Sequence, residues 1–386
     1  MRIGIVIHRY GEDVGGGAEL HAKLVAEHLH PAHPVTVFTT CAKDYVTWRN
    51  SFAPGKTMVN GIPVHRFKVK HPRKPHRFLD IQNRVYKNPH PADLEERWLQ
   101  ENGPYAPRLV QAVSRARHID RWLLFSYRYW TTVQCLRRLG KKALLVPTAE
   151  HDPALYLDLF KPVFHLPRAI VYNSIEEREL IQQASDNRDV PGDVVGVGLV
   201  EQTGAEAVSA AAKQYAADNS YIVYIGRIDM NKSCDHLFRM FRRYGERFDS
   251  NIRLLLIGKQ VMRIPNHPSV DYLGYLSEAD KMYLLQQARL LVMPSKYESL
   301  SMVMLEAWKA GKAVLANNRC EVLSGQCRRS NGGLAYNNTE EFLLALDLLL
   351  NNRALADTLG RQGREYYLTH YTWPAIEAKY EALLHL

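Results

Sequence analysis

The chain has 386 residues, enough for two domains of about 150–200 residues each, and its 46% hydrophobic and 23% charged residues are the balance of a globular protein. No apolar run reaches the ~18–20 residues of a membrane span, and the opening run Arg2–Ile7 predicts a short strand rather than a signal peptide, so we expect a cytoplasmic protein. The formal net charge of +10 favours phosphate-bearing ligands, anionic membrane or nucleic acid as partners.

The N-terminal half alternates apolar strands with helices. Strands are expected at Ile3–Ile7, Val35–Thr39, Leu144–Pro147 and Ala169–Tyr172, and a helix at Ala18–Leu29. Continuous apolar strands that alternate with helices are typical of a parallel sheet covered on both faces.

A second series of the same kind follows the polar, alanine-rich stretch Glu201–Ser220, which we expect to be helical or part of a junction. Strands are expected at Tyr221–Ile225, Ile252–Ile257, Leu290–Met293 and Ala313–Ala316, and helices at Cys234–Tyr244, Glu278–Ala288 and Ser301–Ala310. This order predicts an α/β protein with two doubly wound, Rossmann-like domains that face each other across a cleft. Ligands are expected at the carboxyl ends of the strands.

The first candidate site is the turn Gly15-Gly16-Gly17, between the first strand and the first helix. Free backbone N–H groups and a helix N-terminus can bind an anion there. The three glycines lack the GxGxxG spacing of a dinucleotide fold, and a merely flexible loop is an equal alternative.

The second candidate site is the segment from Gly226 to Lys232, directly after the strand Tyr221–Ile225. Arg227 and Lys232 leave the carboxyl end of a strand five residues apart and can bind two phosphates. Taken alone, this segment is more simply explained as two solvated cations on a loop.

The third candidate site is an E-x7-E pair, Glu298 and Glu306, around the start of the helix Ser301–Ala310. Eight helical residues rise ~12 Å, about the length from a ribose across a diphosphate to a sugar. A carboxylate at each end suits the hydroxyl groups there, and the helix N-terminus between them suits the phosphates. The alternative is two ordinary acidic residues of an α/β protein.

Together these segments resemble the GT-B glycosyltransferases of the large sucrose-synthase and phosphatidylinositol-mannosyltransferase-like family (family 4). The resemblance covers essentially the whole chain: GGAE near the start, GRxxxxK, LLLIG at Leu254–Gly258, LGYLS at Leu273–Ser277, and the block VMPSKYESLSMVMLEAWKAGKAV. It implies an N-terminal, acceptor-binding domain over residues 1–198, joined by a returning C-terminal helix, residues 370–386. Residues 199–369 would form the domain that binds the nucleotide-sugar donor.

The resemblance also implies a role for each matching residue. The donor diphosphate would contact Gly16 and Gly17, and Gly226, Arg227 and Lys232 would hold it from the other domain. The remaining donor-binding positions would be Tyr275 and Leu276 at the base, with Lys281 on the next helix, Glu298 and Ser299 at the sugar, Leu300, Ser301 and Met302 at the phosphates, and Glu306 at the ribose. The sequence has Leu300-Ser301 where the family more often has Phe-Gly, which leaves the donor sugar open.

His151 is the last candidate, because such enzymes often have a histidine after this strand that contacts the donor sugar near its reacting carbon. Taken alone it is more simply an ordinary loop histidine, but its position at a strand end next to Asp152 favours the functional role. The catalytic residues are therefore expected to be His151, Glu298, Arg227 and Lys232. With no obvious carboxylate nucleophile and no DxD element, we expect front-face substitution that retains the anomeric configuration, without a metal or another cofactor. UDP-sugar is the preferred donor and GDP-sugar the next. Alternatives are a non-catalytic nucleotide-sugar-binding protein, a sugar-nucleotide epimerase and a phosphorylase-like enzyme.

The segment from Arg66 to Lys87 carries many cations and one acid, Asp80, inside an apparent insertion that extends to Asp120 and has a helical pattern after Ala92. It would bind a lipid-linked or phosphorylated acceptor, or contact anionic membrane peripherally, or it is only a solvated loop. The acceptor itself would be a glycan, a lipid-linked or a small-molecule hydroxyl. Nucleic acid is not expected, because no aromatic platform is interleaved with the cations.

The cysteines are odd in number, scattered and without a CxxC pair, which argues against disulfides or a metal site and predicts reduced, buried thiols. They are Cys41, Cys135, Cys234, Cys320 and Cys327.

Overall fold

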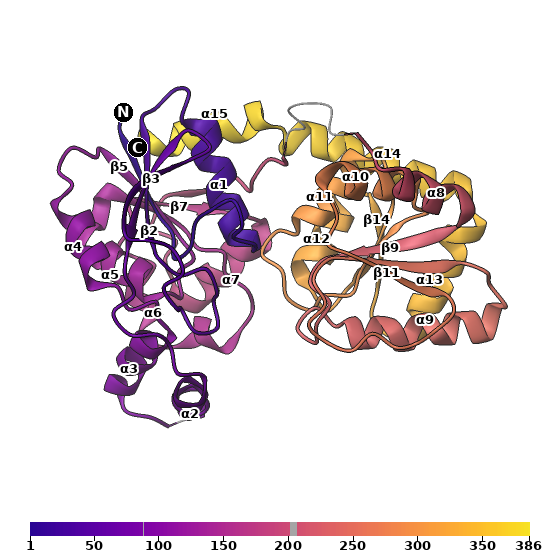
Figure 1. The fold of residues 1–386 in the computed structure, drawn as a ribbon, viewed down its shortest axis with the longest axis horizontal. Helices are drawn as coiled ribbons and strands as arrows, with labels where there is room; N and C mark the ends of the chain where they lie inside the picture. Colours follow the sequence, from indigo (N-terminus) through magenta and orange to yellow (C-terminus); the bar gives the residue numbers. More distant parts are fainter. Residues whose placement is uncertain (88, 201–206) are drawn as a thin grey trace. The chain divides into compact units, whose positions relative to one another are not determined.

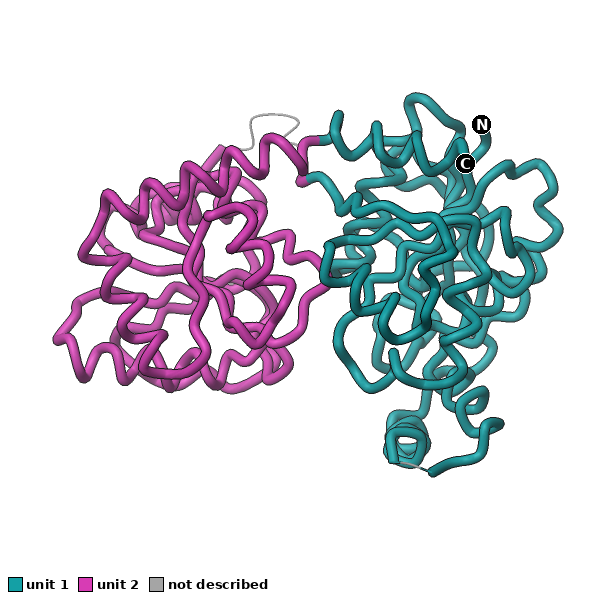
Figure 2. The backbone as a smooth tube through the Cα atoms, turned by 180° about the vertical axis from the view of Figure 1, so that it is seen from behind, with its two compact units in different colours: residues 1–198, 373–386 teal, residues 199–372 magenta. Residues whose placement is uncertain are grey.

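The computed structural model describes residues 1–87, 89–200 and 207–386. It forms two compact units, shown in Figure 2: unit 1 is Met1–Gly198 with Trp373–Leu386, and unit 2 is Leu199–Thr372. The first six residues of the stretch predicted as a junction, 201–206, lie outside the described residues. Within the described part of the chain, no helix is both long and apolar enough to cross a membrane.

Unit 1 is built on an eight-stranded sheet in the order β3-β4-β2-β1-β5-β6-β7-β8. Its strands are β1 (Ile3–Val6), β2 (Val35–Thr40), β3 (Gly55–Val59), β4 (Ile62–Phe67), β5 (Arg121–Phe125), β6 (Ala143–Val146), β7 (Ala169–Tyr172) and β8 (Gly192–Val194). Neighbouring strands are parallel except for β3 and β4, which form an antiparallel hairpin at one edge. The central strands are buried along their whole length, as their continuous apolar sequences predict.

The helices of unit 1 pack on this sheet, except for the projecting pair α2 and α3 (Figure 1). They are α1 (Gly17–Leu29), α2 (Pro75–Val85), α3 (Ala92–Asn102), α4 (Pro107–Arg115), α5 (Trp130–Leu139), α6 (Phe160–Val163), α7 (Ile175–Ser185) and α15 (Trp373–Leu384). The C-terminal helix α15 is held by buried contacts. His21 Nε2 lies 3.2 Å from Tyr380 Oη, and the rings of His28 and Trp373 stack 3.5 Å apart.

Unit 2 has a six-stranded, fully parallel sheet in the order β11-β10-β9-β12-β13-β14. The strands are β9 (Tyr221–Ile225), β10 (Arg253–Ile257), β11 (Val270–Gly274), β12 (Leu291–Met293), β13 (Val314–Asn317) and β14 (Gly333–Tyr336). The helices are α8 (Ala210–Asp218), α9 (Cys234–Phe248), α10 (Glu278–Gln287), α11 (Met302–Lys309), α12 (Glu321–Ser330), α13 (Thr339–Asn351) and α14 (Arg353–His370). The prediction of two Rossmann-like α/β domains is confirmed.

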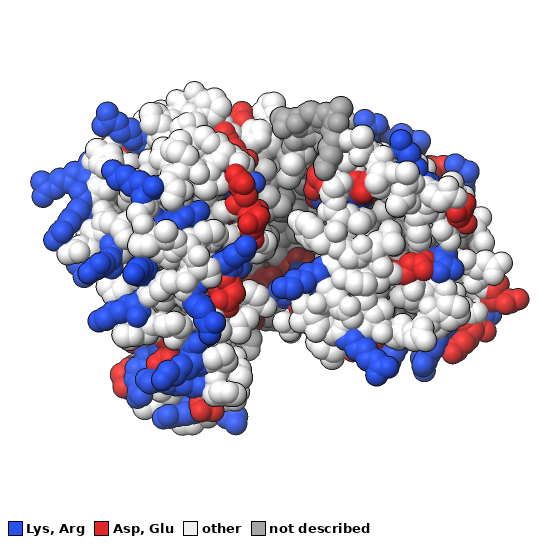
Figure 3. Space-filling model, in the orientation of Figure 1, with Lys and Arg blue, Asp and Glu red and all other residues white. Residues whose placement is uncertain are grey.

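The basic segment is not a single insertion. Arg66 and Phe67 belong to β4 in the sheet, and helices α2, α3 and α4 follow. Arg66 is buried and donates to the carbonyl oxygen of Tyr10 at 2.6 Å, so its charge does not reach the surface. On the face in Figure 3, the projection formed by α2 and α3 carries acidic as well as basic side chains. Helix α3 contributes Asp93, Glu96 and Glu101 to the surface, whereas its fourth carboxylate, Glu95, is buried.

All five cysteines are buried and free, as their spacing predicts.

Candidate functional site

The loop after β9 holds the first pair of predicted cations in unit 2. The buried strand β9 is followed directly by Gly226, whose φ of +149° favours glycine. The carboxylate of Asp229 then organises the loop, because it pairs with the guanidinium of Arg227 and accepts a hydrogen bond from the backbone N–H of Lys232 at 2.9 Å. Both cations are thereby fixed at the carboxyl edge of the sheet. Asp229 was not among the predicted residues, although it lies inside the motif.

The structure brings the second and third candidate sites together. Lys232 Nζ lies 2.6 Å from Glu298 Oε1. Glu298 follows β12, which is the sheet neighbour of β9, so the two loops leave adjacent parallel strands at the same edge. Residues that are 66 positions apart in sequence thus form one cation–carboxylate pair.

The segment between the two glutamates is not helical throughout, so a helical rise does not set their spacing. Helix α11 begins at Met302, so Glu298 lies in the preceding loop and only the last part of the E-x7-E segment is helical. The chain turns sharply at the N-cap residue Ser301, which has a φ of +71° and whose hydroxyl accepts from the backbone N–H of Met304 at 3.4 Å. The loop is further fixed by the buried Gln326, which donates to the carbonyl oxygen of Leu300.

Glu306, on α11, is buried next to a lysine from α10. Lys281 Nζ lies 2.9 Å from Glu306 Oε1 and 2.8 Å from a carboxylate oxygen of Glu278. Burial raises the pKa of Glu306 and Lys281 only partly offsets this, whereas the two carboxylates raise the pKa of Lys281 despite its burial. The second carboxylate oxygen of Glu306, Oε2, has no hydrogen-bond partner in the described part of the chain. It can accept a hydrogen bond from a ligand hydroxyl.

The predicted base-binding residues lie in the turn between β11 and α10. The ring of Tyr275 is 90% exposed, and Leu276 is half-buried. The hydroxyl of Ser277 caps α10 by accepting from the backbone N–H of Asp280 at 3.1 Å. The exposed aromatic ring in the turn that leads into α10 is available to stack on a planar base.

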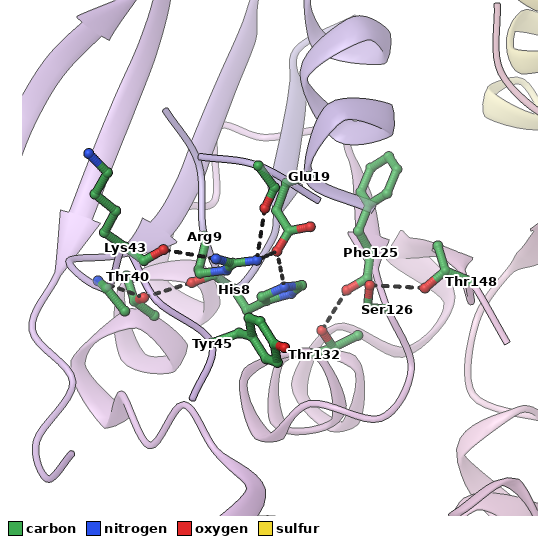
Figure 4. A network of polar contacts seen from close by, with 12 residues as sticks. His8, Arg9, Glu19, Thr40, Lys43, Tyr45, Phe125, Ser126, Thr132 and Thr148 are labelled. Carbon is green, nitrogen blue, oxygen red and sulfur yellow. Dashed lines mark hydrogen bonds and ion pairs between the residues drawn. The ribbon is translucent and has the colours of Figure 1, made fainter. Parts of the chain in front are cut away.

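In unit 1, the glycine turn stands on a buried polar network that the sequence prediction missed (Figure 4). His8 Nε2 lies 2.8 Å from Glu19 Oε1, and the Arg9 guanidinium pairs with the same oxygen. Arg9 also donates to the carbonyl oxygens of Lys43 and Gly15, at 2.8 and 3.2 Å. The signals were visible in the sequence: two polar residues directly after an apolar strand, and the glutamate of GGAE.

This network dictates the glycine at position 16. Gly16 has a φ of +145°, and a Cβ there would lie 2.1 Å from Glu19 Oε2. A Cβ at Gly15 or Gly17 would meet nothing within 4 Å. Burial would raise the pKa of Glu19, but His8 and Arg9 outweigh it and lower that pKa to about 2, so the carboxylate is charged. The positive φ and this close contact therefore favour glycine at position 16, whereas the space at positions 15 and 17 does not require it.

His151 lies on the loop that follows β6. Its ring is exposed and contacts the ring of Tyr156 edge-on at 5.6 Å. The neighbouring Asp152 pairs with Arg128 at 2.7 Å and accepts from the backbone N–H of Ala154 at 2.9 Å. The aspartate next to His151 thus has a structural role.

The same loop is tied to the interior by Glu177, which was not predicted. Its Oε1 accepts from the backbone N–H of Ala149 and its Oε2 from that of Asn173, both at 2.5 Å. Glu177 is 1% exposed, and burial raises its pKa to about 8 although these hydrogen bonds lower it in part.

Comparison with known proteins agrees with this architecture. The family described as Glycosyl transferases group 1 matches residues 209–366, most of unit 2. An uncharacterised glycosyltransferase of Methanocaldococcus jannaschii is 24% identical over 169 residues, 41% of this chain and 43% of that protein. The O-antigen chain mannosyltransferase B of Escherichia coli is 27% identical over 129 residues, 31% of this chain and 34% of that protein. The chain therefore matches less than half the length of these curated relatives.

Solved structures match the whole chain. Sucrose-phosphate synthase from Thermosynechococcus elongatus has a TM-score of 0.71 at 16% identity, covering 100% of this chain and 98% of that one. An E. coli structure described as trehalose-6-phosphate bound with UDP-2-fluoro glucose has a TM-score of 0.74 at 13% identity. The match covers 100% of this chain and 99% of that one. The chain as a whole has the GT-B fold, and its residues 209–366 match the glycosyl transferases group 1 family.

Proposed function

We propose that the protein is a retaining glycosyltransferase of family 4 type, which transfers a hexose-type sugar from a nucleotide diphosphate sugar to an acceptor hydroxyl. The observation that carries this proposal is the convergence of Lys232 and Glu298 from the ends of adjacent strands. The same unit also holds the Lys281–Glu306 pair, between α10 and α11. UDP-sugar is the preferred donor, with GDP-sugar next. The similar E. coli structure bound with UDP-2-fluoro glucose supports this choice.

The ion pairs of unit 2 suggest how the donor would bind. Lys232 and Arg227 each have a carboxylate partner, Glu298 and Asp229. A donor diphosphate would take over part of the charge of both cations and release Glu298 to accept hydrogen bonds from sugar hydroxyls. At the other end, Lys281 neutralises one oxygen of Glu306 while Oε2 stays available for a ribose hydroxyl.

The reaction we propose is a front-face substitution at the anomeric carbon. The bond from that carbon to the diphosphate oxygen breaks, a bond to the acceptor oxygen forms on the same face, and the acceptor proton passes to the departing diphosphate. Arg227 and Lys232 would stabilise the charge that develops on the leaving group, with no metal required. His151 would contact the donor sugar near the reacting carbon.

The acceptor would bind to unit 1, as a glycan, a lipid-linked or a small-molecule hydroxyl. Peripheral membrane contact through residues 66–87 is part of this proposal, although Arg66 is buried and cannot contribute to it.

Product analysis tests the proposal. Wild-type protein with a UDP- or GDP-sugar and an acceptor mixture should release free nucleotide diphosphate and a glycoside of unchanged anomeric configuration. Glu298→Gln should lower the turnover rate by about 10²–10³-fold, the range for loss of one preorganised polar group. The matched control is Glu340→Gln, an exposed carboxylate on α13. An epimerised nucleotide sugar, or binding without turnover, would contradict the proposal and favour the epimerase or the binding protein.

A further inference from the structure

Unit 1 contains a cavity at the same edge of its sheet as the glycine turn. It lies between the loop after β2, the linker from β4 to α2, and the end of α3, and it has a volume of about 280 Å³. The side chains that matter here are Trp48, His71, Arg73, Lys74, Arg77 and Tyr105. This volume is at the lower end of the range for small-molecule sites and suits one substituted sugar.

The cavity is positively charged. Arg73, Lys74 and Arg77 line it together with a single carboxylate, Glu101, which pairs with Arg77 at 2.8 Å. Lys74 and His71 are exposed at its mouth. The wall therefore carries an excess of cations that its own acidic residue does not neutralise.

Arg73 is the strongest indication of an anionic ligand. Its guanidinium lies between the rings of Trp48 and Phe78, 4.9 and 4.4 Å from their centroids. The hydrogen bonds it donates go to uncharged oxygens, the carbonyl and side-chain oxygens of Asn102 and the carbonyl of Tyr45. Burial lowers the pKa of Arg73 to about 10, which leaves it charged at neutral pH. Among the described residues it forms no ion pair, and Asp44 acts on its charge only without direct contact, so a largely enclosed cation stands at the cavity wall with weak compensation.

The cavity also offers aromatic surface and continuity with the glycine turn. The ring of Tyr105 stacks against that of His71 at 6.3 Å and meets Trp130 edge-on at 4.7 Å. Trp48 contacts His8 of the buried network edge-on, with ring centroids 5.7 Å apart. A ligand here would therefore lie close to the turn that we assign to the donor diphosphate.

We propose that this cavity binds the phosphate group of a sugar-phosphate acceptor. Lys74, His71 and Arg77 would contact the phosphate, and Tyr105 would face the apolar side of the sugar ring. The role of this ligand as an acceptor rests on the proposed glycosyltransferase function. Binding of the sugar phosphate to the cavity does not depend on the donor site.

Calorimetric titration without nucleotide tests the cavity separately from the donor site. The probes are hexose 1-phosphates and 6-phosphates, each paired with its free hexose. Wild-type protein should bind at least one phosphate more tightly than its free hexose by roughly tenfold or more, and Lys74→Ala should lose roughly tenfold in affinity. His71→Ala should weaken the same ligand. The control Lys56→Ala removes an exposed cation on β3 that does not line the cavity and should bind as the wild type does.

Equal binding by Lys74→Ala, or no binding of any probe, would overturn the proposal. A third arm measures co-sedimentation with phosphatidylglycerol vesicles. Capture by vesicles without any response to the sugar phosphates would assign these cations to a membrane surface and overturn it as well. Every titration omits nucleotide. A failure to bind sugar phosphates would therefore overturn the acceptor cavity without bearing on nucleotide binding in unit 2.

Discussion

The two units hold their polar groups differently. In unit 2, Lys232 and Glu298 are partly exposed and meet across two adjacent strand ends. In unit 1, His8, Arg9 and Glu19 are almost completely buried beneath a glycine turn. Exposed pairs contribute little to stability, whereas a buried group that loses its partner is costly. The difference indicates that the unit 1 network determines a backbone conformation, while we expect the more accessible Lys232–Glu298 pair of unit 2 to exchange with a ligand.

The largest expected effect is on folding. Glu19→Ala leaves Arg9 and His8 buried without their carboxylate and should lower the free energy of unfolding by about 3–5 kcal/mol. Denaturant unfolding measures this, and Glu12→Ala, on an exposed residue of the same loop, is the control. Similar unfolding curves for the two variants would show that the buried network of unit 1 does not stabilise the fold more than an exposed residue does.

Gly16→Ala should have the next largest effect on stability. The new Cβ would clash with Glu19 at a φ that side chains rarely adopt, so we expect a loss of about 1–3 kcal/mol. Gly15→Ala has open space and is the matched control, which should stay within about 0.5 kcal/mol of the wild type. Equal losses would show that the turn is not fixed by the network.

The pH dependence of the free energy of unfolding tests the buried carboxyl group of Glu177. Its pKa rises from 4.5 to about 8 on folding, so the folded state keeps a proton that the unfolded chain releases, and stability is lost as the pH rises toward 8. Buried His21, with its pKa lowered from 6.5 to about 3, acts oppositely but only below about pH 6.5. Between pH 6.5 and 8 the slope should reach about 1.4 kcal/mol per pH unit. Glu177→Gln should abolish it, and Glu179→Gln on the exposed face of α7 should not. Parallel curves for all three proteins would refute the assignment.

The smallest effect on stability is expected in unit 2. Lys232→Ala should change the free energy of unfolding by no more than about 1 kcal/mol, because the pair is partly exposed. The same variant should lose nucleotide affinity, which Lys259→Ala, on an exposed residue, should retain. A large loss of stability would give Lys232 the same structural role as the unit 1 network.

The sequence predicted the central strands of both sheets because they are buried and continuously apolar, as in Tyr221–Ile225. It missed the hairpin of β3 and β4, since β3 is mostly exposed at the sheet edge and its sequence has no apolar run. It also missed β5, Arg121–Phe125, which directly follows the segment interpreted as an insertion. The edge strand β3 lacks the pattern that identifies a buried strand, whereas β5 has the buried apolar run Trp122–Phe125 and could have been recognised from it.

The sequence indicated Arg227 and Lys232 as a candidate pair because both belong to one motif in one loop, and their role stays a prediction. Asp229, Glu19 and Glu177 escaped prediction because an acidic residue in a sequence is usually solvated. Only the fold shows that these three carboxylates each fix a loop through backbone or cation contacts.

The central claim is that unit 2 binds a nucleotide diphosphate through Arg227 and Lys232. Thermal-shift titration with UDP, GDP, ADP and dTDP, each with and without Mg²⁺, tests it on wild type and Arg227→Ala. A nucleotide at 100 times its dissociation constant should add ~2.7 kcal/mol to stability. We predict stabilisation by one nucleotide without Mg²⁺, lost in the variant. No stabilisation by any nucleotide, or equal stabilisation of the variant, would contradict the account.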